Sequence, residues 1–214
     1  MSSYAHLLEP KKLPAQKRSQ ETYELILKVT AELLADVGVE RLSTNLVCKQ
    51  AGLSPPALYR YFPNKYALLH ELGVRLMRDQ NELVERWLTP EVLLKPADLL
   101  HPALVGLMMD THRVTADTTA GVWITRALRA VPLLNEVRIA SHHVVTDQLQ
   151  AAMMMVHPDV DPVRLRINIR LSVDVLYSAI EMMFDDPTLE LPVVVDSCAW
   201  LVYDLFDRMG VIRP

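Results

Sequence analysis

The chain has 214 residues, half of them hydrophobic, and it carries 22 Lys and Arg against 26 Asp and Glu, a formal net charge of −4. This length and composition allow one or two domains with a buried core and exclude a disordered chain. The longest uncharged runs have 11 residues, which is too few to span a bilayer, so no membrane partner is expected.

The N-terminus and the cysteines predict a cytoplasmic protein. Glu9 and several lysines precede the first long apolar stretch, a pattern unlike that of a signal peptide. Cys48 and Cys198 are too few and too far apart for a disulfide framework, which suits a reducing compartment. We expect both to be small buried apolar residues, with a redox-sensor role as the alternative.

Charge is unevenly distributed along the chain. Residues 1–65 hold 9 basic against 6 acidic residues, whereas residues 66–214 hold 13 against 20. A basic segment on an acidic remainder is typical of a small nucleic-acid-binding domain attached to a larger body. On charge alone, chance scatter is an equal alternative, so the sequence pattern has to decide.

Apolar residues recur at helical spacing throughout, and only six glycines interrupt them, which predicts an all-α protein of about nine helices. In chain order we expect a mobile basic arm over 1–15, helices over 16–37 and 44–51, a short third helix capped by Ser54, and a long helix over 65–88. Gly38 and Gly52 are the predicted stops of the first two helices.

Pro90, Pro96 and Pro102 interrupt the helical pattern between residues 89 and 102 and predict a hinge. Beyond it we expect helices over 99–116, 118–130, 133–156, 162–184 and 192–209. The predicted organisation is therefore a helix-turn-helix domain over 16–64, a connecting helix and hinge over 65–102, and a ligand-binding and dimerisation domain over 103–214.

Two short helices joined by Gly52-Leu53-Ser54 have the spacing of a helix-turn-helix, whose second helix offers its N-terminal residues to the major groove of DNA. Hydroxyl and amine groups that suit phosphate oxygens stand at Thr44, Ser54, Tyr59, Tyr61 and Lys65. Arg60 is long enough to reach a guanine edge, and contacts by shape are expected from Pro55, Pro56 and Ala57.

Residues 42–69, LSTNLVCKQAGLSPPALYRYFPNKYALL, resemble the N-terminal domain of the TetR family of bacterial transcription regulators. The matching positions are Thr44, Ala51-Gly52, Ser54, Leu58-Tyr59, Tyr61-Phe62, Lys65 and Leu68-Leu69. The sequence departs from the usual pattern at Val47-Cys48, Pro56 and Tyr66, where Ile-Ala, Gly and an acidic residue are common. The resemblance implies a DNA-binding N-terminal domain followed by a divergent helical domain that binds a ligand and forms a dimer.

The helix predicted over 162–184 has two apolar stripes, one through Ile167 and Leu171 and the other through Ile169 and Val173, and the last helix repeats this pattern. We expect one stripe to face the core and the other to meet a symmetry mate. This predicts a homodimer through the last two helices that binds a palindromic operator in double-stranded DNA. A chain that covers both stripes itself is the alternative.

A regulator that responds to a ligand needs a cavity, and ten methionines offer an adaptable apolar lining. Candidates for contact with a small, largely apolar effector are Met108, His112, Trp123, Arg126, His143, Met153, Asp174 and Tyr177. For each of them a role in the core or at the surface is the alternative.

His143 and Asp147 lie four residues apart on one helical face, which is the spacing of half a metal site or of a catalytic pair. No third ligand stands at a usual spacing, and no HExxH, CxxC, GxSxG or Gly-rich phosphate loop occurs, so no enzyme, metal or cofactor is expected. The sequence thus predicts a repressor released by a small apolar effector. The alternatives are a DNA-binding regulator without a small ligand and a helical enzyme centred on His143 and Asp147.

Overall fold

A computed structural model describes Leu8 and residues 16–212, and within this part of the chain every regular element is a helix. The α-helices are α1 (Lys17–Arg41), α2 (Thr44–Ala51), α3 (Pro55–Tyr59), α4 (Lys65–Trp87), α5 (Pro90–Leu94), α6 (Pro96–Asp117), α7 (Gly121–Ala130), α8 (Asn135–Val156), α9 (Pro162–Asp185) and α10 (Leu191–Asp207), with a short 3₁₀ helix η2 (Pro132–Leu134) before α8. The all-α prediction is confirmed. Apart from Leu8, the basic arm predicted over 1–15 lies outside the described residues.

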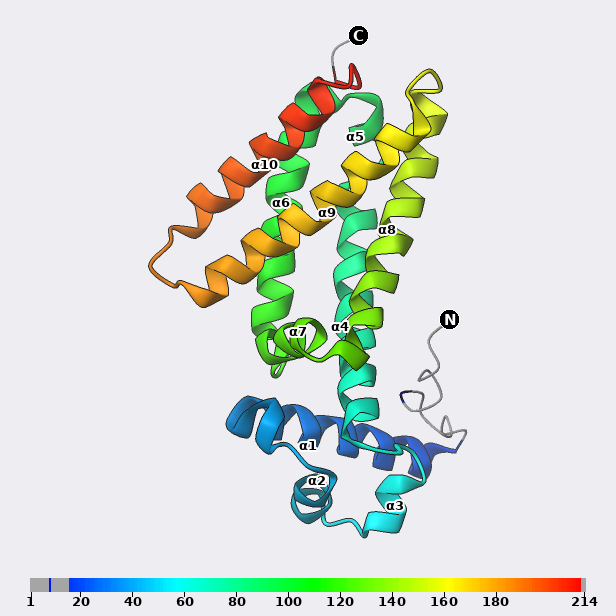
Figure 1. Cartoon of the computed structure of the whole chain (residues 1–214), viewed down its shortest axis with the longest axis vertical. Coiled ribbons are helices and arrows are strands. Elements are labelled where there is room, and N and C mark those ends of the chain that lie inside the picture. The colour runs from blue at the N-terminus through cyan, green and yellow to red at the C-terminus, as the bar shows by residue number, and fades with distance from the viewer. Residues whose placement is uncertain (1–7, 9–15, 213–214) are drawn as a thin grey trace. The chain divides into compact units, whose positions relative to one another are not determined.

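The chain forms two compact units, and it passes from one to the other more than once. Of the described residues, the N-terminal unit comprises those up to 77 and 116–138, and the C-terminal unit comprises 78–115 and 139–212. Helices α1 to α3 belong to the first unit, whereas α9 and α10 pack side by side in the second (Figure 1). Helix α4 contributes residues to both units. None of the described helices is long and apolar enough to cross a membrane.

In the N-terminal unit, α1 buries one apolar stripe that includes Tyr23, Ile26 and Leu34. Tyr23 stacks on Phe62 with ring centroids 4.8 Å apart, which joins α1 to the segment after α3. The regular helix breaks at Gly38, whose φ of 73° lies in the left-handed region that glycine tolerates, so the predicted stop at this residue is confirmed.

Arg75 on α4 adds a charged clamp to α1. Its guanidinium donates to both oxygens of Glu24, at 2.7 and 2.8 Å, and to Glu71 at 2.9 Å. Hydrogen bonding from Arg75 lowers the pKa of the Glu24 carboxyl, since it favours the ionised form. The clamp therefore holds α1 against α4 within this unit.

The C-terminal unit has a core of aliphatic and aromatic side chains from α5, α6, α8, α9 and α10. Residues at its centre include Leu104, Leu165, Ile169 and Val202. Asp110 on α6 is buried but compensated, because it accepts a hydrogen bond from Trp87 Nε1 at 2.9 Å. The predicted cysteine burial is also confirmed for Cys198 here and for Cys48 in the N-terminal unit.

The three prolines expected to form a hinge instead belong to helices. Pro90 and Pro96 are the first residues of α5 and α6, where a missing backbone N–H costs nothing, and Pro102 lies inside α6. Thr89 caps α5 by accepting from Val92 N at 3.4 Å. The described chain consequently has ten α-helices rather than about nine, because α5 was expected to be irregular.

We expect Gly106→Ala to destabilise the C-terminal unit. A Cβ at Gly106 would lie 2.3 Å from ring carbons of Trp87. Overpacking of this kind costs about 1–3 kcal/mol, which offsets the gain of up to about 1 kcal/mol from replacing glycine in a helix. Urea unfolding followed by circular dichroism measures the change in the free energy of unfolding. In a Trp87→Leu background the substitution should cost less; an equal cost in both backgrounds would contradict this origin of the strain.

Candidate nucleic-acid interface and ligand cavity

Helices α2 and α3 form a helix-turn-helix because the residues between and before them suit its turns. The Ser43 hydroxyl caps α2 by accepting from Leu46 N at 3.3 Å, and Gly52 takes the left-handed conformation, with φ of 65°, that ends this helix. Pro55 occupies the first position of α3. Ser54 stands at the N-cap of α3, but its side chain makes no capping hydrogen bond, contrary to the expected capping role.

Several residues predicted to contact DNA lie at the surface of this motif. Ser54, Pro55, Pro56, Tyr59 and Arg60 are exposed, and Thr44 and Ala57 are half-buried. The hydroxyls of Thr44 and Tyr59 lie 3.0 Å apart in a hydrogen bond that joins the start of α2 to the end of α3. Arg60 lies over the ring of Tyr61, with its guanidinium carbon 5.4 Å from the ring centroid. The accessible side chains thus combine hydroxyls with one long cation.

Two residues predicted to bind phosphate have other partners. The ring of Tyr61 is only 3% exposed and packs edge-on against Tyr23, so it belongs to the core of the N-terminal unit. Lys65 turns inward, where its amine donates to Val39 O at 3.1 Å and Leu42 O at 3.3 Å. It thereby fastens the connection between α1 and α2. Sequence reasoning missed the exposed Lys49 on α2, a cation that helical spacing alone assigns to the side opposite the buried Val47.

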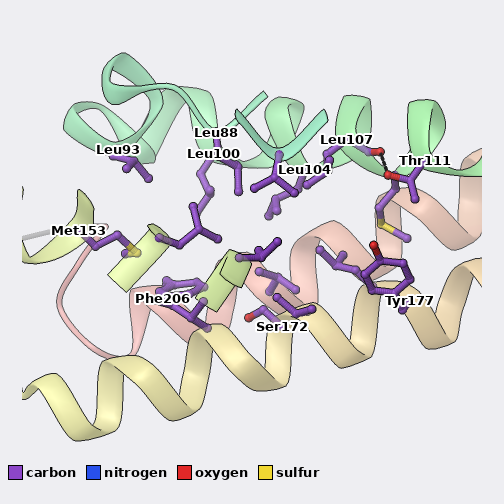
Figure 2. Close-up of a pocket in the computed structure, with 18 of the residues that line it drawn as sticks. Leu88, Leu93, Leu100, Leu104, Leu107, Thr111, Met153, Ser172, Tyr177 and Phe206 are labelled. Carbon is purple, nitrogen blue, oxygen red and sulfur yellow. Dashed lines mark hydrogen bonds between the residues drawn. The ribbon is translucent and has the colours of Figure 1, made fainter. Parts of the chain in front are cut away.

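An elongated apolar cavity lies inside the C-terminal unit (Figure 2). Its walls come from the second half of α4, from α5, α6, α8, α9 and α10, and from Val211. Most of the lining is aliphatic, and it includes Leu88, Leu93, Leu100, Leu104, Leu107, Val145, Leu149, Ile169, Val173, Leu176, Ile180 and Val202. Polar groups in the described lining come only from Gln80, Thr111, Ser172 and Tyr177.

Three of the eight residues predicted to contact a ligand line this cavity: Met108, Met153 and Tyr177. The others lie elsewhere. Trp123 and Arg126 are on α7 in the N-terminal unit, where the guanidinium carbon lies 5.3 Å from the Trp123 ring centroid. His112 stacks on Phe184 with centroids 4.4 Å apart, and burial lowers its pKa.

His143 and Asp174 also lie outside the lining. His143 is exposed, and its neighbour His142 is the buried member of the pair: its Nδ1 lies 3.1 Å from Asp174 Oδ1, and its ring stacks on Tyr177. Asp147, the expected partner of His143, forms an ion pair with Arg166. This arrangement does not favour a catalytic pair at 143 and 147. Among the described residues, no three His, Cys, Asp or Glu side chains converge in a metal site.

Sequence reasoning did not identify Gln80, Thr111 and Ser172 as lining residues. Gln80 had a detectable signal, since it stands four residues after Leu76 and four before Val84 on the buried side of α4. A polar residue in an apolar stripe indicates either a hydrogen-bonded core group or a site. Here the Gln80 side chain is buried from solvent and lines the cavity.

Helices α9 and α10 present a second, solvent-exposed apolar surface. On α9 the stripe through Ile169 and Val173 is buried, while Ile167 and Leu171 are at least half exposed. On α10, Leu201 is exposed, whereas Cys198 is buried. The outward surface of the two helices, called here the α9–α10 face, comprises Val163, Ile167, Leu171, Val175, Met182, Val193, Trp200 and Leu201.

The helix-turn-helix geometry and the separate helical unit define a protein of the helix-turn-helix DNA-binding class. Residues 26–72 match the family model described as bacterial regulatory proteins, tetR family. This segment is therefore a TetR-family N-terminal domain, and solved regulators of the TetR family share the fold of the chain.

Relatives of known sequence and structure support this assignment. The chain is 30% identical over 107 residues to the HTH-type transcriptional regulator Rv2912c of Mycobacterium tuberculosis, a match that covers 50% of this chain and 52% of that protein. The matched region therefore spans about half the length of this curated relative. A tetR-family regulator from Streptomyces coelicolor shares the fold, with a TM-score of 0.67 and 17% identity over 89% of this chain and 82% of that one. The structure of the SmeT–triclosan complex is similar at a TM-score of 0.62 and 18% identity, covering 91% and 96%.

We expect Lys65→Met to lower the stability of the N-terminal unit, because the carbonyls of Val39 and Leu42 would lose their shared donor. The expected loss is about 1–3 kcal/mol in the free energy of unfolding, measured by chemical denaturation. Lys49→Met is the matched control, since Lys49 is exposed and its replacement should change stability by less than about 0.5 kcal/mol. Equal stability of the two variants would mean that Lys65 does not hold the α1–α2 connection.

Proposed function

We propose that this protein is a homodimeric transcriptional repressor that leaves its operator when a small, largely apolar molecule enters the cavity of the C-terminal unit. The observation that carries the proposal is α4. This single helix begins at Lys65, which holds the connection between α1 and α2, and its second half contributes Gln80 and Val84 to the cavity wall. One continuous element thus contributes to both proposed sites.

DNA contact is assigned to the exposed side of α2 and α3. Thr44, Ser54 and Tyr59 carry hydroxyls for phosphate oxygens, and the Ser54 hydroxyl is not used as a helix cap. Arg60 is the candidate for a base edge, with the small surface of Pro55 to Ala57 fitting by shape. Lys65 and Tyr61 act indirectly, by holding the motif together, rather than as phosphate ligands. Because the proposed partner is genomic DNA, we place the protein in the bacterial cytoplasm.

Dimerisation is assigned to the α9–α10 face. Its apolar side chains are exposed in the single chain, and burying them against the same face of a second copy would form a four-helix interface. A symmetric dimer presents two recognition helices to a palindromic operator, with half-sites about 34–36 Å apart or a multiple of that spacing.

The cavity supports control by a small molecule over control by abundance or a protein partner alone. SmeT, a protein of similar fold, forms a complex with the small molecule triclosan. An effector changes DNA binding only if it binds one conformation better than the other, so it must fit the cavity best when the recognition helices no longer match the operator.

We expect Arg60→Ala to weaken binding to an operator in the DNA upstream of the protein's own gene by about 1–3 kcal/mol. The affinity for operator DNA should fall more than the affinity for scrambled DNA. Tyr59→Phe should weaken binding more uniformly across sequences, because it removes a phosphate-facing hydroxyl. Mobility-shift titrations on operator and scrambled DNA measure both effects. Arg208→Ala, at an exposed position of the C-terminal unit, is the control. Unchanged binding by both Arg60→Ala and Tyr59→Phe would refute the assigned interface.

We expect Leu171→Glu and Leu201→Glu to convert the dimer to a monomer, because a carboxylate at the centre of an apolar interface loses its hydration without a partner. Analytical ultracentrifugation measures the mass, and the operator affinity should fall in parallel. Leu94→Glu replaces an equally exposed leucine on α5, outside the α9–α10 face, and should leave the dimer intact. A dimer that survives both substitutions would exclude this face as the interface.

A further inference from the structure

The hydroxyl of Tyr177 donates its hydrogen bond to another residue of the protein. It donates to Gln80 Oε1 at 3.0 Å, and Gln80 Nε2 in turn donates to Thr115 Oγ1 at 2.8 Å. Burial raises the pKa of Tyr177 far above its ordinary value, so the phenol stays neutral. Its oxygen retains lone pairs that accept hydrogen bonds, and only one N–H of the Gln80 amide is left to donate.

The other two hydroxyls in the lining also donate their protons within the protein. Thr111 donates to Leu107 O at 2.7 Å, the interaction drawn as a dashed line in Figure 2, and Ser172 donates to Asn168 O at 2.8 Å. A hydroxyl has one proton and two acceptor lone pairs. The cavity therefore offers a ligand several acceptors and almost no donors.

Charge is missing from this wall, because the described residues that line the cavity include no Asp, Glu, Lys, Arg or His. A carboxylate or an ammonium group would lose its hydration on entering this cavity. The lining provides neither an opposite charge nor enough hydrogen bonds to compensate for that loss. A carboxylate is the worse match of the two in hydrogen bonding, since it only accepts and the lining mostly accepts as well.

The cavity is long and polar mainly towards one end. Its wall on α6 runs from Pro96 to Thr111, about 22 Å at 1.5 Å per residue. Thr111 and Tyr177 lie at one end, and Leu93 and Met153 lie at the other (Figure 2). Such a shape fits an extended chain whose polar group stays at the Thr111–Tyr177 end.

We infer that the cavity selects an elongated, uncharged molecule with an apolar chain and one hydrogen-bond-donating group, a long-chain alcohol or phenol, and discriminates against fatty carboxylates and alkylammonium ions of the same length. This inference rests on the proposed function only in taking the cavity as the effector site. Binding itself does not depend on DNA, so the two can be tested separately.

Isothermal titration calorimetry of the full-length protein, without DNA, tests the preference with decanol, decanoate and decylammonium at neutral pH. These probes share a chain length and differ in charge. We expect decanol to bind roughly tenfold or more tightly than either ion. Equal binding of decanol and decanoate, tighter binding of either ion, or no binding of decanol would overturn the inference.

Substitutions then locate the polar group. Thr111→Val removes an acceptor oxygen while keeping the side-chain shape, and it should weaken decanol binding by roughly threefold to tenfold. Thr146→Val is the matched control, with little expected effect: Thr146 is buried on α8, lies outside the lining and, like Thr111, donates to the carbonyl four residues before it. Val173→Phe fills the cavity and should abolish binding, with circular dichroism and thermal unfolding reporting that each variant is folded. Equal decanol affinity of Thr111→Val and Thr146→Val would overturn the assigned end.

A mobility-shift assay with each probe separates this inference from the proposed repressor. If decanol binds selectively and releases DNA, both hold. If it binds selectively and leaves the DNA complex unchanged, the ligand preference holds and decanol-induced release from the operator fails. If decanoate both binds better and releases DNA, the repressor stands and the inferred ligand class is wrong.

Discussion

Helix α4 has to pack in two different environments with one uninterrupted run of 23 residues, and much of the structure depends on that requirement. Its first half buries Ala67, Leu68 and Leu69 in the N-terminal unit. Its second half turns Gln80 and Val84 towards the cavity of the C-terminal unit. The same helix thus supplies buried residues to both units.

Three buried or half-buried polar side chains of α4 form hydrogen bonds with other helices and connections. Lys65 supplies a donor to two carbonyls at the α1–α2 connection, and Arg75 clamps Glu24 on α1. Gln80 lies in an otherwise apolar surface and is bonded on both sides, to Tyr177 and Thr115. These three buried or half-buried side chains all have hydrogen-bond partners, and an unpaired one would cost about 1–3 kcal/mol.

The two proposed sites use opposite electrostatics. A DNA-binding surface works through cations and hydroxyls that stay exposed to phosphates, and the basic residues are in excess over residues 1–65. The cavity wall is neutral, and the acidic excess of residues 66–214 disfavours contact with DNA through the C-terminal unit. The overall charge of −4 is therefore compatible with a DNA-binding protein.

Interactions between neighbouring residues of the chain account for the features that were predicted correctly. Helical spacing predicted the all-α fold and its long helices. Gly38 marked the break inside α1, and Gly52 marked the end of α2. The double stripe of residues 162–184 indicated one buried and one exposed apolar side. These features depend on residues within one or two helical turns of each other, so neighbours along the chain suffice to predict them.

Tertiary packing alone decided which side chains face a site. Tyr61 and Lys65 belong to the expected motif but turn inward, because Tyr23 and the carbonyls of the α1–α2 connection are there to meet them. His142 rather than His143 is buried because Asp174 and Tyr177 on α9 pack against it. Gln80 became part of the cavity wall through partners 35 and 97 residues away. Contacts between residues so distant in the chain leave no local periodicity, and for that reason only the folded structure reveals them.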